Sequence, residues 1–172
     1  CGVLGFGRIG QIFGKMAKGM GMKVIAYDAY PNESGKEIAE YVSLEELYAQ
    51  SDVISVHCPM TAETAHMINK DTIAKMKDGV ILLNVSRGGL QVDADIAEAL
   101  KSGKLRGCGL DVAEPEPITM DDALLDAPNC LITPHNAWCT EAAKKRMLEG
   151  VIDNMIAFVE GHPQCVVNNP VK

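Results

Sequence analysis

Residues 1–10, CGVLGFGRIG, contain the stretch that decides the fold. A short apolar run leads into a G-x-G-x-x-G hexamer at 5–10, and an amphipathic segment follows, which is typical of the turn between a buried strand and a helix. Gly5 permits the tight turn, Gly7 lets a pyrophosphate approach bare backbone, and Gly10 lets the helix pack closely on the strand. An isolated hexamer also fits a turn made only for packing, so the rest of the chain must decide between the two interpretations.

Composition limits the possible function classes. The 172 residues, 47% hydrophobic and 23% charged, predict one globular domain of ordinary size. A net charge of −7 without a basic cluster argues against a nucleic-acid partner. With no apolar run of the ~18 residues that a membrane span needs, and no signal peptide, we expect a cytoplasmic protein without a membrane partner. The chain opens on a strand rather than on an initiator methionine, so we expect a piece of a longer protein.

The six cysteines are scattered without C-x-x-C spacing. Cys58, Cys108 and Cys130 lie in or beside apolar runs, where a free cysteine behaves as a small hydrophobe. We therefore expect reduced thiols rather than disulfides, and no metal site.

Helical periods and capping residues predict the helices. The spacing of Ile9, Ile12, Phe13, Met16 and Ala17 predicts an apolar stripe that lies on a sheet. Four later helices are predicted. The first runs from the capping box Ser43–Glu46 to about Gln50, and the second from Asn69 or Asp71 through Met76. The third is capped by Asp93 and covers 94–101, and the fourth is opened by Thr140 and Glu141 and runs to about Val159.

Strands alternate with these helices, which predicts an α/β fold with a doubly wound parallel sheet, Rossmann-like in character. Short apolar runs predict strands at 3–4, 23–27, 53–56, 80–85, 107–112 and 130–132, with loops at 29–37 and 113–127.

Ligands of such sheets bind beyond the carboxyl ends of the strands. The polar residues of this chain fall at those ends, which is stronger evidence for a ligand site than the hexamer alone. They are Asp28, His57–Pro59, Ser86–Arg87, Asp111 and His135.

Asp28 follows Gly10 by 18 positions and ends the second strand. A carboxylate there can accept both hydroxyls of an adenine ribose and would repel a 2′-phosphate, which favours NAD over NADP. The alternative is a solvated acid at a strand end.

Three further residues carry possible chemistry. Arg87, between a buried strand and glycines, can hold a substrate carboxylate in a bidentate fork, or it can be a surface arginine that satisfies helix-end carbonyls. Glu116 beside His135 would fix the histidine's tautomer and favour an imidazolium that donates a proton to a carbonyl oxygen. Spacing alone does not pair two residues 19 positions apart.

Six segments of the chain together resemble the NAD-binding domain of the D-isomer-specific 2-hydroxyacid dehydrogenases. The match covers essentially the whole chain, in the family's order and spacing. The segments are GFGRIG at 5–10, Asp28, HCPMTAETAHMI at 57–68, NVSRGG at 84–89, GLDVAEPEP at 109–117 and TPHNAW at 133–138.

The resemblance implies an oxidoreductase that transfers hydride between NAD(H) and a small 2-hydroxy or 2-oxo acid. It implies that Arg87 binds the substrate carboxylate, that Glu116 orients the histidine and that His135 is the acid/base. Asp111 would lie near the nicotinamide carboxamide. The implied cofactor contacts are Gly5, Gly7, Arg8, Ile9, Gly10, Asp28, Cys58, Pro59, Thr64, Val85, Ser86, Arg87, Asp111, His135 and Ala137.

Three positions bear on the subgroup. Asn136 stands where an aliphatic residue usually follows the histidine, and Ser86 replaces the commoner alanine. Neither change removes a catalytic group. With Trp138, the chain resembles one subgroup of the family, the glycerate dehydrogenases, also called hydroxypyruvate reductases.

The family's two-domain construction implies that 1–172 form the NAD-binding domain, that the N-terminal substrate domain is absent and that 140–172 return to it. It also implies a homodimer. Alone, this piece is expected to bind NAD(H) but to reduce 2-oxo acids poorly.

Two other classes share parts of the pattern. NAD-sensing transcriptional corepressors of the C-terminal-binding-protein type resemble the family and stay open as an alternative. Glyceraldehyde-3-phosphate dehydrogenase also opens with G-F-G-R-I-G, but it is set aside because none of the six cysteines has an S-C-T-T-N context.

Overall fold

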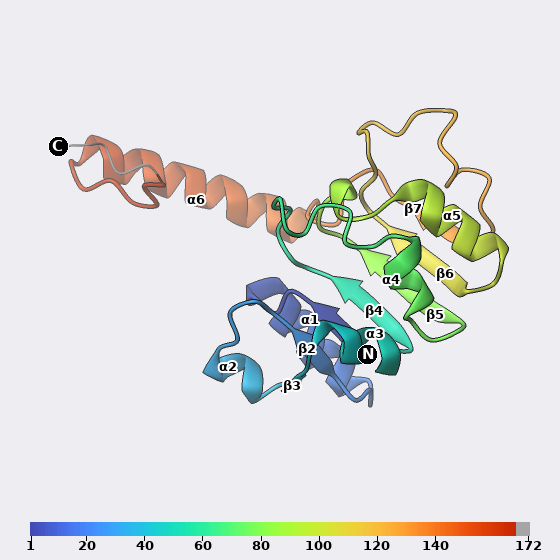
Figure 1. Cartoon of the computed structure of the whole chain (residues 1–172). Helices are drawn as coiled ribbons and strands as arrows, with labels where there is room; N and C mark the ends of the chain where they lie inside the picture. The colour runs from blue at the N-terminus through green and yellow to red at the C-terminus, as the bar shows by residue number, and fades with distance from the viewer. Residues whose placement is uncertain (168–172) are drawn as a thin grey trace. The chain divides into compact units, whose positions relative to one another are not determined.

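A computed structural model describes residues 1–167. The chain divides into two compact units, residues 1–135 and 136–172. The first unit is built on one sheet of seven parallel strands in the order β3-β2-β1-β4-β5-β6-β7 (Figure 1). The strands are β1 (Gly2–Leu4), β2 (Ile25–Tyr27), β3 (Glu40–Tyr41), β4 (Val53–Val56), β5 (Val80–Asn84), β6 (Leu105–Leu110) and β7 (Cys130–Ile132).

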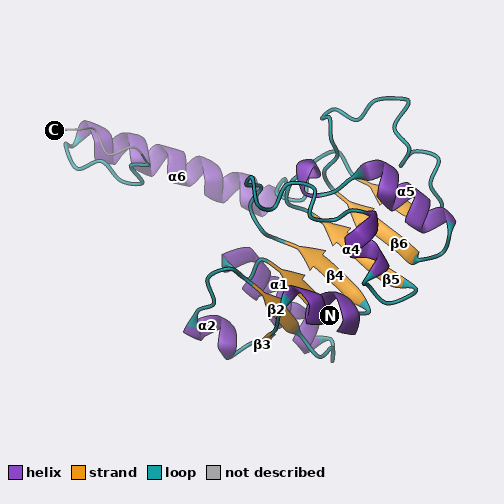
Figure 2. Ribbon diagram, viewed as in Figure 1, coloured by secondary structure: helices purple, strands orange, loops and turns teal. Residues whose placement is uncertain are grey.

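Helices connect the strands, and the doubly wound parallel sheet predicted from the sequence is confirmed (Figure 2). The first unit contains α1 (Arg8–Gly19), α2 (Glu33–Lys36), α3 (Leu44–Gln50), α4 (Lys70–Ala74), a 3-10 turn at Gly88–Leu90, and α5 (Asp93–Lys101), and the second unit contains α6 (Glu141–Val159).

The two faces of the sheet are buried in separate clusters. Val3 packs with Phe6 and with Ala17 of α1, whereas its neighbour Leu4 packs with Leu47 of α3 and with the larger core under α4 and α5. Successive side chains of a strand point to opposite faces, so β1 contributes to both layers. The strand order reverses between β1 and β4, which places a crevice of the kind that binds ligands beyond their carboxyl ends.

The predicted apolar stripe of the first helix is wrong for most of its members. Only Phe13 and Ala17 pack against the core, whereas Ile9, Ile12 and Met16 are 69%, 59% and 58% exposed. The helix instead turns its small residues toward the sheet, because it lies too close for larger side chains. A Cβ on Gly10 would meet the Gly5 carbonyl oxygen at 2.2 Å, and one on Gly14 would meet the Phe6 ring at 3.0 Å.

Most predicted caps are confirmed, and one is wrong. Ser43 and Glu46 form the capping box, Asn69 caps α4 and Thr140 caps α6. Asp93 is instead the first residue of α5, after the N-cap Val92. Its carboxylate is used elsewhere, because it accepts hydrogen bonds from the Gln91 side chain and from the Glu114 backbone N–H.

The expected loop at 29–37 contains structure that its composition conceals. Asn32 accepts a hydrogen bond from the Gly35 N–H and starts the single helical turn α2, and the two-residue strand β3 follows. One helical turn and two strand residues are too short to show a period in the sequence.

The second unit consists of α6 and its flanking residues. The helix covers Glu141–Val159, as predicted, and its N-cap Thr140 accepts from the Ala143 N–H at 3.2 Å. Within residues 1–167, no helix is long and apolar enough to cross a membrane.

Candidate active site

The glycine turn packs directly on the end of β4. Gly5 has a φ of +86°, and a Cβ there would lie 2.4 Å from the Cys58 backbone nitrogen, so only glycine fits. Above Gly7, by contrast, a Cβ would find no atom of residues 1–167 within 4 Å apart from Gly7 itself and its two chain neighbours. No described side chain caps the helix that starts after Gly7, which leaves its first N–H groups toward this open space. The turn therefore fits a pyrophosphate at the start of α1.

Asp28 lies at the end of β2 and is tied to this turn. Its Oδ2 accepts from the Phe6 N–H at 2.6 Å, and its Oδ1 accepts from the Tyr30 N–H at 2.8 Å. Asp28 therefore holds the turn in place, and its contact with a ribose stays a prediction. A carboxylate has about four acceptor positions, so two backbone bonds leave capacity for ribose hydroxyls.

Gln11 connects the turn to the chain beyond Asp28. Its Nε2 donates to the Phe6 carbonyl at 2.9 Å and to Asn32 Oδ1 at 3.1 Å, and the Ser34 hydroxyl donates to its Oε1 at 3.1 Å. Gln11 was not among the site residues predicted from the sequence. A polar residue in the first turn after the glycines was the available signal.

His57 and Cys58 form the floor of the crevice between β1 and β4. His57 Nε2 lies 2.8 Å from the Ser55 hydroxyl, and its ring is centred 5.1 Å from the Phe13 ring. Burial lowers the pKa of His57 to about 4, so the ring is neutral near pH 7. Burial likewise raises the pKa of the Cys58 thiol to about 11, which keeps it protonated. These residues shape the floor and carry no charge.

Thr64 and Ser86 hold the loops on either side of the crevice. The Thr64 hydroxyl donates to the Pro59 carbonyl at 2.8 Å, and the Ser86 hydroxyl donates to the Val56 carbonyl at 3.0 Å. Buried Asn84, which sequence reasoning missed, accepts from the Ser86 N–H and donates to the Arg87 carbonyl, both at 3.0 Å. The loop that carries Arg87 is thus supported from below.

The structure pairs Glu116 with His135, which the spacing alone left open. His135 Nδ1 and Glu116 Oε2 lie 2.8 Å apart, and Glu116 Oε1 accepts from the Ala113 N–H at 3.2 Å. The hydrogen bond from His135 is the main cause that lowers the pKa of Glu116, and the positive charge of Arg87 contributes to the same shift. A carboxylate in this position fixes the tautomer of the histidine.

Asp111 lies below this dyad and is 4% exposed. Its Oδ1 accepts from the Thr133 hydroxyl at 2.5 Å, and its N–H donates to the Asn84 carbonyl at 2.9 Å. A cavity of about 460 Å³ opens beside these groups, with Asp111, Glu116 and His135 in its lining and Ile118 among its apolar walls. Carboxylates, an imidazole and apolar walls thus share one cavity.

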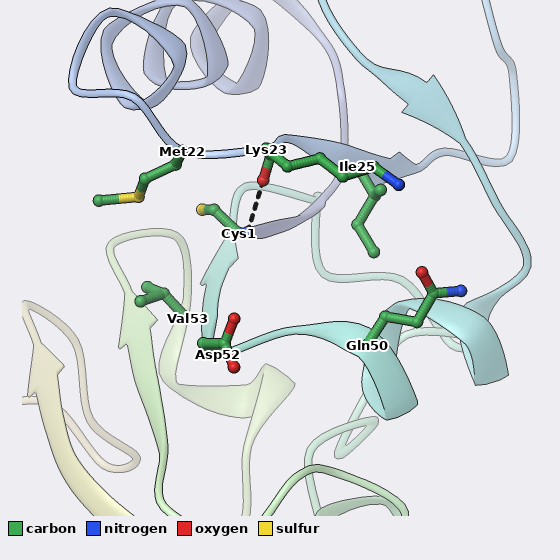
Figure 3. A pocket seen from close by; sticks show the side chains of 7 residues that line it. All are labelled: Cys1, Met22, Lys23, Ile25, Gln50, Asp52 and Val53. Atoms are coloured by element: carbon green, nitrogen blue, oxygen red, sulfur yellow. Dashed lines mark hydrogen bonds between the residues drawn. The ribbon is translucent and has the colours of Figure 1, made fainter.

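Another cavity, of about 260 Å³, is lined by Cys1, Lys23, Gln50 and Val53 (Figure 3). The Cys1 ammonium donates to the Lys23 carbonyl at 2.8 Å beside it. This cavity lies at the amino ends of β1 and β4, at the opposite edge of the sheet from the glycine turn and the Glu116–His135 dyad. Its lining contains no residue that the sequence predicted for a site.

The remaining predicted contacts divide between the two units. Arg8 and Ile9 form the exposed first turn of α1, Val85 is 41% exposed, and Arg87 donates to the Ser86 carbonyl at 2.7 Å from an exposed position. Ala137 belongs to the second unit, so its contact with a cofactor stays a prediction.

One cross-loop pair was also missed. His66 Nε2 lies 3.2 Å from Glu114 Oε2, which joins the loop after β4 to the loop that carries Glu116. Residues 48 positions apart in sequence give no local signal of such a contact.

The parallel sheet, the open glycine turn, and Asp28 define a dinucleotide-binding domain. The profile of the D-isomer specific 2-hydroxyacid dehydrogenase family, NAD binding domain, matches residues 1–137. The chain belongs to this family, and the resemblance predicted from its motifs is confirmed.

Two curated relatives and two solved structures show how far the similarity extends. The chain is 52% identical to a hydroxypyruvate reductase of Blautia hydrogenotrophica, over 97% of this chain and 52% of the relative. It is 41% identical to a glycerate dehydrogenase of Methylorubrum extorquens, over 96% of this chain and 52% of that one. A D-lactate dehydrogenase structure from Treponema pallidum gives a TM-score of 0.91 at 38% identity, over 99% of this chain and 55% of that one. A structure of D-lactate dehydrogenase with NAD⁺ from Lactobacillus jensenii gives a TM-score of 0.91 at 31% identity, over 98% of this chain and 55% of that one.

The chain spans about half the length of these relatives. They are described as reductases and dehydrogenases, so they lend no support to the corepressor alternative. The cofactor of the domain is NAD.

We predict that Asp28→Ala and Asp28→Asn separate the two tasks of this carboxylate. Both remove the charge that repels a 2′-phosphate, so both should raise NADPH affinity relative to NADH. Only alanine also removes the acceptor of the Phe6 N–H, and it should weaken both cofactors by a further ~10-fold. Fluorescence titration with NADH and NADPH measures this, with Glu33→Gln, an exposed carboxylate on α2, as the control. An unchanged NADH-to-NADPH ratio in both variants would count against the ribose role.

The burial of His57 predicts that the free energy of unfolding depends on pH. Its folded pKa of about 4 lies below the ordinary value of 6.5, so between these values the unfolded chain binds more protons. The free energy of unfolding should therefore fall as pH drops from about 6.5 to about 4, by on the order of 2–3 kcal/mol. Urea unfolding across this pH range should show a smaller decrease in His57→Asn, whereas His162→Gln, a substitution at an exposed histidine, should keep it. Equal slopes in the His57 variant and the parent would contradict the assignment.

Proposed function

We propose that the whole protein oxidises and reduces a small acid at carbon 2, between the 2-hydroxy and 2-oxo forms, with NAD(H). The observation that carries the proposal is the Glu116–His135 pair at 2.8 Å beside the positive charge of Arg87. Such a set supplies a proton donor for a carbonyl oxygen and a cation for a carboxylate within one site.

The residues fit the cofactor on structural grounds. The space above Gly7 is open, the first N–H groups of α1 have no described side-chain cap, and Asp28 retains acceptor capacity. When bound, the nicotinamide supplies or takes up the hydride. The turn at 5–10 would hold the pyrophosphate, and Asp28 the adenine ribose.

Each residue of the dyad region has one task in this proposal. Arg87 binds the substrate carboxylate through its planar guanidinium and thereby orients carbon 2. His135 gives a proton to the oxygen on carbon 2 during reduction and takes it back during oxidation. Glu116 accepts from Nδ1 of His135, so the ring presents Nε2 to the substrate.

Glycerate and hydroxypyruvate are the substrates that we propose. The support is the similarity to the hydroxypyruvate reductase and the glycerate dehydrogenase, at 52% and 41% identity. Initial rates of the full-length protein with hydroxypyruvate, glyoxylate, pyruvate and bulkier 2-oxo acids test this choice, and a clear preference for a bulkier acid would overturn it.

We also propose a cytoplasmic homodimer. Six free cysteines fit a reducing compartment. The exposed row Ile12, Met16 and Met20 runs along α1, and a two-fold related copy would bury it in a self-complementary interface.

For the catalytic step, we predict that His135→Gln in the full-length protein lowers kcat by at least ~10²-fold and leaves the NADH dissociation constant nearly unchanged. The reason is that the substitution removes the transferable proton and keeps the volume of the side chain. Stopped-flow rates and NADH titration measure the two effects, with His162→Gln as the control. If the loss of NADH affinity matched the loss of kcat, His135 would not be the acid/base.

For the assembly, we predict that the double variant Ile12→Glu and Met16→Glu converts the dimer to a monomer, because two carboxylates per copy would have to be buried at the interface. Sedimentation velocity measures the mass. Met120→Glu, which alters a 92% exposed apolar residue of the 113–127 loop, should leave the dimer intact. A dimer that survives the double variant would place the interface elsewhere.

A further inference from the structure

Two cysteines lie side by side on neighbouring strands. β6 and β7 are parallel, and Cys108 and Cys130 are direct partners in their register. In-register residues of paired strands project to the same face, and the Sγ atoms are 3.3 Å apart. Neighbouring strands lie about 4.8 Å apart, within the Cα separations that disulfides tolerate, so small side-chain rotations would join the two sulfurs.

The two thiols differ in access and acidity. Cys108 is 6% exposed, whereas Cys130 is half-buried on the edge strand. Cys108 donates its S–H to the Cys130 sulfur, which lowers the pKa of Cys130, and the same bond raises the pKa of Cys108. The carboxylates of Asp93 and Asp122 and partial burial oppose the shift at Cys130. One accessible nucleophile therefore lies against a resolving thiol, which is the arrangement of oxidation-sensitive cysteine pairs.

We propose that Cys108 and Cys130 are a reversible oxidation site, at which a peroxide converts the two thiols into a disulfide. The Cys130 thiolate attacks a peroxide oxygen, so an S–O bond forms, the O–O bond breaks and the leaving hydroxide takes up a proton as water. Cys108 then attacks the Cys130 sulfur, the S–S bond forms and the S–O bond breaks with loss of a second water. The two thiols lose two electrons, which reduce one hydrogen peroxide to two waters.

The pair lies three residues before Asp111 on one strand and before Thr133 on the other. Those two side chains share the 2.5 Å hydrogen bond below the dyad. Oxidation would therefore link the two strands that carry this side of the candidate active site. The proposal concerns a covalent bond and does not rest on the proposed reaction.

The test is peptide mapping of the full-length protein. Reduced protein is treated with a small excess of hydrogen peroxide, and its remaining thiols are alkylated. The protein is then cut at acidic residues, because no lysine or arginine separates Cys108 from Cys130, and the peptides are analysed by mass spectrometry. We expect a Cys108–Cys130 linked peptide as the dominant product, two hydrogens lighter than the separate peptides and cleaved by dithiothreitol. Linkage mainly between other cysteines, or oxidation of others while Cys108 and Cys130 stay alkylated, would overturn the proposal.

Single variants test the roles within the pair. Cys108→Ser should leave a Cys130 sulfenic acid that dimedone traps, whereas Cys130→Ser should slow oxidation of Cys108 by at least ~10-fold, because the nucleophile is gone. Cys139→Ser, a matched cysteine outside the pair, should form the linked peptide at the parental rate. Circular dichroism checks that the variants are folded, and equal Cys108 oxidation rates in Cys130→Ser and the parent would contradict the assignment.

A dithiol reagent provides a measurement that needs no oxidation. Phenylarsine oxide bonds to two thiols at once, so the reduced protein should take up one equivalent at this pair and then resist peroxide linkage there. Uptake that is unchanged in both Cys108→Ser and Cys130→Ser would place the reactive dithiol elsewhere and would overturn the proposal.

Discussion

The parallel direction of all seven strands is the constraint on which the rest of the first unit depends. Each strand ends at the same edge of the sheet, so every polar residue that follows a strand is delivered to one side of the molecule. Asp28, Asp111 and His135 come from three different strand ends, yet they face a common region for this reason alone. Reversal of β2, β6 or β7 would have sent the group that follows that strand to the opposite edge.

Backbone amides and buried polar side chains keep that edge in order. Asp28 ties the glycine turn to β2, Asn84 supports the loop before Arg87, and Thr133 bridges β7 to Asp111. These hydrogen bonds satisfy polar groups that folding removes from water. A buried polar group without a partner would destabilise the fold by its full desolvation free energy. The chemically active groups Arg87 and His135 can then remain accessible on loops.

Short-range signals explain the parts of the fold that the sequence predicted well. The caps Ser43, Asn69 and Thr140 act on backbone groups within three residues, so their sequence is sufficient evidence. The face that α1 buries was predicted wrongly. The prediction rested on the helical spacing of apolar side chains, which indicates the buried face only when those side chains fit against the sheet. Here the closeness of the helix to Phe6 and to the Gly5 carbonyl excludes side chains, and the glycine face packs inward instead.

The sequence by itself determined the class of fold and the edge of the site, because alternation of strands and helices and the positions of strand ends are local properties of the chain. Only the tertiary structure decided which residues meet. Glu116 reaches His135 through the path of the 113–127 loop, and Cys108 meets Cys130 through the register of β6 with β7. Loop paths and strand registers depend on contacts between residues far apart in sequence, and no periodicity along the chain encodes them. The glycine turn could be recognised from the sequence. The open space above Gly7 and the hydrogen bond from the Phe6 N–H to Asp28 appear only when the chain is folded.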